Sequence, residues 1–338
     1  MATGPPIEDV LRRVDVWAGR TVSHRPIEGG LSHHIWRVDA GNRSYVLRVL
    51  DPAVSEVGLG VAPEVEIANT RTAAESGIGA RVFEVLPEVP ALVLEYLPGR
   101  TLTAADVREP STMDRIAAVC RRLHAGRRFG NRFDIIDKLH ELLDICRRHD
   151  LRIPDGYADR VKVADRLAAA LASAPLPAVP CHNDLLAENL LDVGGQIRIV
   201  DYQLSGDNDP TFELGDIAAE ADFTPDEAER LAVAYFSDEL TPALLARVRA
   251  QLMLSNVTWT LWLSVHSGLL SRPGPDHRGA AEDKWRQACR DLDSPDLGRI
   301  LDAVGGRRRH AFRRVTEWRP WRRARSTTTA SRTLGESP

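Results

Sequence analysis

Lysine and cysteine are scarce in this chain. Lysine occurs only at positions 138, 162 and 284 of the 338 residues, so arginine supplies 41 of the 44 basic side chains. Any function that requires a lysine in the first third of the chain is therefore excluded. The four cysteines, at positions 120, 146, 181 and 289, show no disulfide-like or zinc-like spacing, so we expect a reduced, cytoplasmic compartment.

Long apolar runs are also missing. The longest stretch without a charged residue covers residues 250–271, and it contains Ser255, Asn256 and His266 among other polar side chains. A segment this polar is typical of a buried helix and not of a membrane span. Because residues 1–13 contain no apolar core of signal-peptide length, we expect no export, and we predict a soluble protein.

Charge is distributed unevenly along the chain. The formal net charge is −4, but residues 306–338 carry ten Arg and two Glu, so this tail has a net charge of +8 and the rest of the chain −12. Arginine alternates with aromatic residues in the tail, a pattern that could contact nucleic acid or an anionic membrane. A solvated, disordered tail accounts for the same composition, and we expect no specific nucleic-acid partner.

A small, strand-rich region comes first. Its apolar residues alternate as in half-buried strands along residues 44–50, 81–86 and 91–97. Between the first two of these segments, residues 63–79 have the composition of a helix that stops at glycine. These elements predict a small antiparallel sheet that carries one main helix.

A larger helical region follows the Pro98-Gly99 break. Apolar residues recur at helical spacing up to about residue 304, interrupted by short strands near residues 179–201. We therefore predict an α+β protein with two lobes and a tail: residues 1–97, 98–305 and 306–338. Small ligands tend to bind in the cleft between two such lobes.

The segment HNDLLAEN and the strand after it carry the strongest chemical signal. Asp184 and Asn189 fall in one short loop, and Asp201 follows the apolar strand 197–200. A kinase needs a carboxylate that accepts the proton of the acceptor hydroxyl, and oxygen ligands that hold magnesium against the nucleotide phosphates. A polar turn and a helix cap would explain these residues singly, but not their combination and spacing.

HNDLLAEN together with VDYQLSGDNDPTFELGD resembles the choline/ethanolamine kinase branch of the aminoglycoside-phosphotransferase-like kinases, over roughly residues 25–270. The resemblance implies a two-lobed, protein-kinase-like fold with ATP and Mg²⁺ as cofactors. It also implies that Asp184 is the catalytic base and that Asn189 and Asp201 bind Mg²⁺. His182 is then a structural residue under the loop.

The N-terminal lobe contains a glycine segment, GGLSHHIW. Gly29, Gly30, Leu31 and Ser32 could bring backbone N–H groups against nucleotide phosphates, although a tight hairpin turn explains them equally well. By the resemblance, Glu95–Leu97 form the hinge whose backbone holds adenine.

Arg48 stands on the strand where protein kinases have a lysine, and the resemblance associates this exchange with choline kinases. A guanidinium can span two phosphate oxygens. Glu66 is the expected ion-pair partner of Arg48, with Glu64 as its rival. A solvated helix face is the alternative for both glutamates.

The candidate residues for binding the acceptor lie in the segments VTWTLW and FELGDIAAE. Trp259 and Trp262 share one helical face, either as a buried core stripe or, by the resemblance, as part of an aromatic cage around a trimethylammonium group. Glu220 aligns with the acidic partner of that cation. Tyr235 is a possible third wall, or a core tyrosine.

We therefore predict a kinase for the hydroxyl of a small amino alcohol, with choline first and ethanolamine as an alternative. An aminoglycoside acceptor would instead need an open acidic groove, which could draw on Asp207, Asp209, Asp222, Asp226 and Glu227. These residues also suit a loop and a helix N-terminus. From a different class, the chain could be an inactive nucleotide-binding module that acts through its basic tail. The sequence leaves the oligomeric state open.

Overall fold

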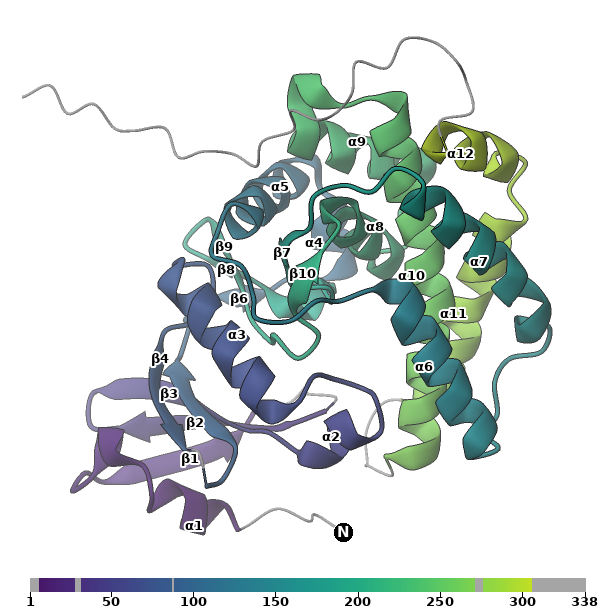
Figure 1. Cartoon of the computed structure of the whole chain (residues 1–338). Helices are drawn as coiled ribbons and strands as arrows, with labels where there is room; N and C mark the ends of the chain where they lie inside the picture. Colours follow the sequence, from purple (N-terminus) through teal and green to yellow (C-terminus); the bar gives the residue numbers. More distant parts are fainter. Residues whose placement is uncertain (1–5, 28–31, 87, 271–275, 306–338) are drawn as a thin grey trace, which may run out of the picture.

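A five-stranded antiparallel sheet forms the N-terminal lobe of the computed structural model (Figure 1). The structure describes residues 6–27, 32–86, 88–270 and 276–305. The strands are β1 (Val22–Pro26), β2 (His34–Ala40), β3 (Arg43–Val49), β4 (Val82–Leu86) and β5 (Ala91–Glu95), in the order β1-β2-β3-β5-β4. The helical segments of this lobe are α1 (Ile7–Leu11), η1 (Asp15–Trp17), α2 (Pro52–Glu56) and α3 (Pro63–Glu75).

The alternation of β3 positions its side chains on two faces of the sheet. Tyr45 and Leu47 are buried in one hydrophobic cluster with Trp17 of η1. Arg48 points to the opposite face, where its guanidinium meets Glu66 of α3. Because β3 pairs with both β2 and β5, the backbone at Arg48 is held from both sides.

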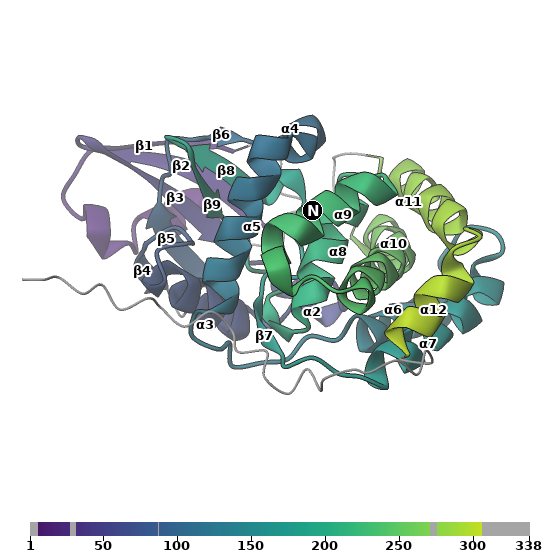
Figure 2. The ribbon, with the colours of Figure 1, turned by 90° about the horizontal axis from the view of Figure 1, so that it is seen from above.

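Helices make up most of the C-terminal lobe (Figures 1 and 2). They are α4 (Ala104–Arg108), α5 (Pro110–His124), α6 (Ile135–Arg148), α7 (Tyr157–Ala172), α8 (Pro210–Glu220), α9 (Pro225–Phe236), η3 (Ser237–Glu239), α10 (Pro242–Leu269), α11 (His277–Leu292) and α12 (Leu297–Val304).

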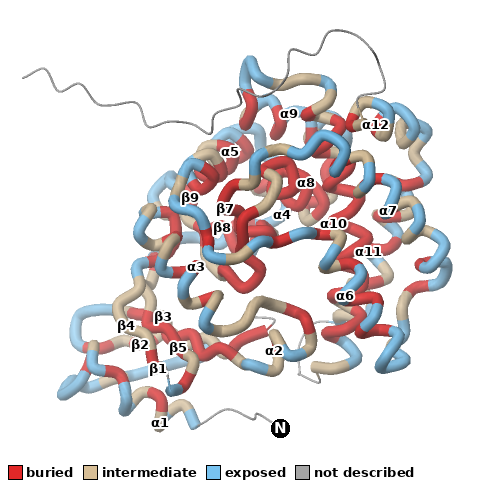
Figure 3. Tube along the Cα trace, in the orientation of Figure 1, coloured by how far each residue is buried: buried red, intermediate tan, exposed pale blue. Residues whose placement is uncertain are grey.

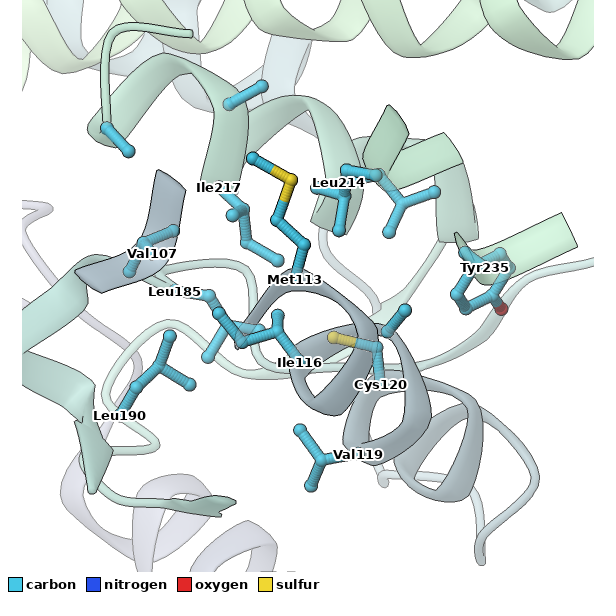
Figure 4. Close-up of a cluster of buried hydrophobic side chains, with 14 of the residues drawn as sticks. Val107, Met113, Ile116, Val119, Cys120, Leu185, Leu190, Leu214, Ile217 and Tyr235 are labelled. Carbon is cyan, nitrogen blue, oxygen red and sulfur yellow. The ribbon is translucent and has the colours of Figure 1, made fainter. Parts of the chain in front are cut away.

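Helix α10 is the centre of this lobe, and it is buried over most of its length (Figure 3). It contacts α6, α7, α8, α9, α11 and α12. One hydrophobic cluster gathers around α5, α8 and α9 (Figure 4), and a second around α6, α10 and α11. Because α10 is buried on all sides, apolar residues occur around the whole circumference of its charge-free stretch, with polar residues among them.

Short strands form the part of the C-terminal lobe next to the sheet. β6 (Arg100–Thr101), β8 (Leu190–Val193) and β9 (Gln196–Ile199) make a three-stranded antiparallel sheet. β7 (Val179–Cys181) pairs with β10 (Gly206–Asn208), and η2 (Ala187–Asn189) lies between β7 and β8. These pairings place the loop after β7 beside the loop after β9.

The two-lobed α+β architecture confirms the prediction from the sequence. The N-terminal sheet ends at Glu95, and Arg100 already pairs with the C-terminal lobe, so the chain changes lobe between them. The buried helix predicted within 250–271 is part of α10, which begins eight residues earlier, at Pro242, and ends at Leu269. Among the described residues, no helix is long and apolar enough to cross a membrane. The tail 306–338 lies outside the described residues.

Candidate active site

Two loops of the C-terminal lobe carry the predicted catalytic residues. The first follows β7 and contains Asp184 and Asn189, and the second follows β9 and contains Asp201. Asn183 links them, because its Nδ2 donates to the carbonyl oxygen of Leu204 at 3.0 Å. Asn183 and Asp201 both have positive φ, 66° and 70°. Such backbone is unusual for residues with a side chain and is concentrated at functional sites.

Asn189 fixes the first loop from within. Its Nδ2 donates to the carbonyl oxygen of Asp184 at 2.8 Å and lies 3.4 Å from Asp184 Oδ2. Because the amide nitrogen faces Asp184, Asn189 Oδ1 is the atom that could bind a cation. With the carboxylate of Asp201 it gives an all-oxygen donor set, which is the chemistry that Mg²⁺ prefers. The residues present therefore fit the predicted magnesium.

Asp184 lies in acidic surroundings. Burial raises the pKa of its carboxyl well above the ordinary value, and the charges of Asp216, Asp201 and Glu220 raise this pKa further. The carboxylate consequently binds a proton more tightly than a free aspartate does. This property suits a group that takes a proton from an alcohol.

Two carboxylates of α8 support the first loop. Glu213 accepts hydrogen bonds from the backbone N–H groups of His182 and Asn183, both at 2.8 Å, and Asp216 accepts one from the N–H of Leu185 at 3.0 Å. Since residues three apart share a helix face, both carboxylates reach the same loop. This role was not predicted from the sequence. The available signal was a pair of acidic residues at that spacing inside a largely apolar helix.

His182 has the structural position that the resemblance implied. Its side chain is fully buried, its Nε2 donates to the carbonyl oxygen of Val200 at 2.9 Å, and its ring packs edge-on against Tyr202. Burial lowers the pKa of the imidazole, so the ring is neutral. The bond to Val200 ties the first loop to the residue immediately before Asp201.

Arg48 is the centre of a buried ion-pair network that joins the two lobes. Its Nε donates to Glu66 Oε1 at 2.9 Å, and its Nη1 and Nη2 both contact the carboxylate of Asp201, Nη1 at 3.0 Å. His33 Nε2 lies 3.2 Å from Glu66 Oε2. Glu64, the rival partner, is exposed. The predicted pair of Arg48 with Glu66 is therefore present, whereas its contact with Asp201 was not predicted.

The contact with Arg48 sets the charge of Asp201. Burial alone would raise the pKa of this carboxyl, but the charge and hydrogen bonds of Arg48 outweigh burial and lower the pKa below the ordinary value. Asp201 is therefore ionised at neutral pH, as a cation ligand must be. A nucleotide-bound cation would have to compete with Arg48 for this carboxylate.

The glycine segment is only partly described. Gly29, Gly30 and Leu31 lie outside the described residues. Ser32 is buried, and its Oγ lies 3.1 Å from Gln203 Nε2, a donor two residues beyond Asp201. The glycine segment thus ends at a contact with the second loop.

The predicted hinge, from Glu95 to Leu97, uses its backbone within the protein. The N–H of Glu95 donates to the carbonyl oxygen of Arg81 at 2.8 Å, and the carbonyl oxygen of Leu97 accepts from the N–H of Gly99 at 2.8 Å. A role of this segment in holding adenine stays a prediction.

Trp259 and Trp262 lie one turn apart on α10, and both are buried. The indole N–H of Trp259 donates to Asp216 Oδ1 at 2.7 Å, and that of Trp262 donates to the carbonyl oxygen of Leu59 at 3.0 Å. Both rings belong to the second hydrophobic cluster, as a core stripe would. Trp259 is also linked to the first loop, because its partner Asp216 accepts a hydrogen bond from the backbone of that loop. An aromatic wall for the acceptor stays a prediction.

Glu220, at the end of α8, pairs with a lysine. Its Oε1 lies 2.9 Å from Lys284 Nζ on α11. This pair was not predicted from the sequence, because the two residues are far apart in the chain. Glu220 is near enough to Asp184 to raise the pKa of that carboxyl.

Tyr235 has the core position that was the alternative to a third wall, and its role as that wall stays a prediction. Its ring belongs to the hydrophobic cluster of Met113 and Cys120, not to that of the two tryptophans (Figure 4). Its hydroxyl lies 2.6 Å from His124 Nδ1. The apolar side chains of α5 and α9 bury the ring, which is the core role that the sequence left open.

The acidic residues of the alternative polycation groove have other partners. Asp207 pairs with Arg128, Asp209 caps α8 and pairs with Arg247, Asp222 pairs with Arg290, Glu227 caps α9, and Asp226 lies exposed in the first turn of α9. In this part of the described chain they serve as helix caps and ion pairs, the simpler interpretation.

The chain is similar to a known protein family and to curated proteins. The model of the phosphotransferase enzyme family (APH) matches residues 23–250. Among curated proteins, the chain is similar to protein LicA of Haemophilus influenzae, with 24% identity over 250 residues, which cover 70% of this chain and 71% of LicA.

Solved structures show the same similarity. A choline/ethanolamine kinase family protein of Mesorhizobium loti superposes with a TM-score of 0.77 at 30% identity, over 89% of this chain and 98% of that protein. LicA in complex with AMP superposes with a TM-score of 0.66 at 19% identity, over 84% of this chain and 96% of LicA. The second similarity concerns the fold alone.

Proposed function

Because the chain belongs to the phosphotransferase enzyme family, as a choline/ethanolamine kinase-like member, we propose that it transfers the γ-phosphate of ATP to the hydroxyl of a small amino alcohol. One observation carries the proposal: two adjacent loops bring together Asp184, Asn189 and Asp201. The high proton affinity of Asp184 and the all-oxygen donor set of the other two residues supply what phosphoryl transfer requires.

In the proposed reaction, the acceptor oxygen forms a bond to the γ-phosphorus while the bond from phosphorus to the ADP oxygen breaks. Asp184 orients the acceptor hydroxyl and accepts its proton. Asn189 Oδ1 and the Asp201 carboxylate would hold Mg²⁺, which neutralises phosphate charge when bound. Arg48, held by Glu66, adds positive charge on the nucleotide side. Positioning and charge neutralisation do the work, without a covalent intermediate on the protein.

Choline is the first acceptor to test. A quaternary ammonium donates no hydrogen bond, so it needs ring faces and a carboxylate, and each cation–π contact contributes about 0.5–2 kcal/mol. Trp259, Trp262 and Glu220 would supply these groups. Ethanolamine is the second candidate, and the observation that favours it is the pairing of Glu220 with Lys284.

The direct test is ADP release from Mg·ATP with choline, ethanolamine and a panel of aminoglycosides, each measured against a blank without acceptor. We expect turnover with at least one of the two amino alcohols well above the blank. Turnover with an aminoglycoside alone would keep the kinase machinery but contradict the amino-alcohol acceptor.

Deleting residues 306–338 should leave turnover intact, whereas loss of all function would favour the binding module that acts through its tail.

The ring of Trp259 gives the sharper test of the choline site. Trp259→Ala should damage the use of choline far more than that of ethanolamine if the ring faces the acceptor. Equal losses would make Trp259 an ordinary core residue.

A further inference from the structure

Lys284 is a buried ammonium beside the proposed acceptor site. Its side chain is only 10% exposed, and its Nζ lies 2.9 Å from Glu220 Oε1. The same nitrogen donates to the carbonyl oxygen of Ala219 at 3.1 Å. Lys284 is one of only three lysines in the whole chain. A second such lysine, Lys138, pairs with Glu141 at 2.6 Å and donates to the carbonyl oxygen of Gly58 at 3.2 Å.

The ion pair lies within electrostatic reach of the catalytic loop. The charge of Glu220 acts on the carboxyl groups of both Asp184 and Asp216. Glu220 therefore belongs to the same acidic group of residues as the proposed base. In the proposed function, a cation on Glu220, from the protein or from the acceptor, would therefore lie near the hydroxyl that Asp184 orients.

On the premise of the amino-alcohol kinase function above, we propose that Lys284 is a specificity-determining residue that favours acceptors with a primary ammonium over acceptors with a quaternary ammonium. In the ion pair, the positive charge of Lys284 already balances the negative charge of the Glu220 carboxylate that the acceptor would meet. The two kinds of acceptor respond differently to that balance.

A primary ammonium carries N–H groups, so it can donate to Glu220 Oε2 while Lys284 holds Oε1. This hydrogen bond survives although the net charge of the pair is close to zero. A trimethylammonium has no N–H, and its methyl groups keep its nitrogen away from the carboxylate. It therefore depends on net charge and ring faces alone, and Lys284 removes most of the net charge.

The test replaces Lys284 and follows the ratio of kcat/KM for choline to kcat/KM for ethanolamine. Lys284→Met removes the ammonium and restores a net negative charge at Glu220, so the ratio should rise at least about tenfold, the scale of one desolvated charge contact. Lys284→Arg keeps the charge and should keep the wild-type ratio. Lys138→Met is the matched control, because it removes a lysine with the same two kinds of partner, and it should leave the ratio unchanged.

A second neutral variant guards against misfolding of the first. Lys284→Gln retains an N–H donor for the Ala219 carbonyl oxygen, so it should raise the ratio even if Lys284→Met does not fold, as judged by circular dichroism. An unchanged ratio in a folded neutral variant that turns over both acceptors would overturn the role of Lys284 and leave the proposed function standing. Absence of turnover with every amino alcohol, in the wild type and the variants, would overturn both.

Discussion

Two parts of the candidate site are held by different kinds of contact. In the proposed function, the nucleotide side comprises Ser32, Arg48, Glu66 and Asp201, and the acceptor side comprises Glu220, Trp259 and Trp262. On the nucleotide side, Arg48 comes from the N-terminal sheet and Asp201 from the C-terminal lobe, so their ion pair exists only while the lobes stay in place. On the acceptor side, Glu220 and Trp259 are fixed by partners within the helical lobe. The nucleotide side therefore depends on how the lobes are placed, whereas Glu220 and Trp259 depend on the packing of α8, α10 and α11. Trp262 is the exception, because its indole N–H donates to Leu59 of the N-terminal lobe.

Asp184, where the two sides meet, should give the largest effect. Asp184→Asn keeps the shape of the side chain but removes the proton acceptor, so turnover should fall by about 10³-fold. Binding of Mg·ATP should survive, because Asn189 and Asp201 are intact. ADP release and calorimetric titration with Mg·ATP measure the two properties. Loss of nucleotide binding together with turnover would contradict the role of a base.

Arg48 tests whether the nucleotide side can fail alone. Arg48→Ala should lower kcat/KM for ATP by about 10²-fold, the usual cost of losing one preorganised charge on a transferring phosphoryl group. The KM for the acceptor should change little. Arg48→Lys keeps the charge but not the fork and should fall between the wild type and alanine. A parallel loss of acceptor affinity would show that the two sides are not independent.

The carboxyl of Asp216 predicts a pH dependence of stability on the acceptor side. Burial and the charge of Glu220 raise its pKa to about 7, from 3.8 in the unfolded chain. Between these values the folded state binds more protons than the unfolded state, so the free energy of unfolding falls by about 3 kcal/mol as pH rises from 4 to 7.

Denaturant titrations at several pH values measure this slope in the wild type and in Asp216→Asn. The difference between the two slopes isolates Asp216, because the other ionisable groups are shared. We expect a flatter profile for the variant. An equal slope in both proteins would mean that Asp216 is ionised throughout this range.

The hydrogen bond from Trp259 to Asp216 should give the smallest effect. Trp259→Phe keeps an aromatic ring and removes the N–H, at a cost of about 1 kcal/mol, or roughly fivefold in kcat. Trp262→Phe is the matched variant, because its N–H bonds to Leu59 and not to the support of the catalytic loop. If both variants lose activity equally, the link through Asp216 has no special role.

The sequence predicted the elements and the short-range motifs well, for a physical reason. The alternation that placed Arg48 on one face of β3, and the spacing of Asp184 and Asn189, are local properties that any fold of this chain must respect. The pair of Glu220 with Lys284 depends instead on how α11 packs beside α8. No local pattern encodes that packing, so the pair was missed.

Tyr235 also shows that the sequence pattern does not determine how helices pack. An aromatic residue on an amphipathic helix fits a hydrophobic core as well as a ligand pocket, and only the packing of α9 on α5 decides between them. The buried pair Glu213 and Asp216 was detectable in principle. Two carboxylates at helical spacing among apolar residues must find hydrogen-bond donors, and the backbone of the catalytic loop provides them.

The ion pair between Arg48 and Asp201 has a consequence for the energetics of nucleotide entry. Both side chains left bulk water when the chain folded, and each already has an oppositely charged partner. In the proposed function, binding of a nucleotide with its cation would be an exchange of partners: Arg48 would turn from a carboxylate to a phosphate, and Asp201 from a guanidinium to the cation. The free-energy cost of dehydrating these two groups is thus incurred once, in folding, and not again in each catalytic cycle. Until the ligand binds, each group serves as the charged partner of the other, which is a form of electrostatic preorganisation.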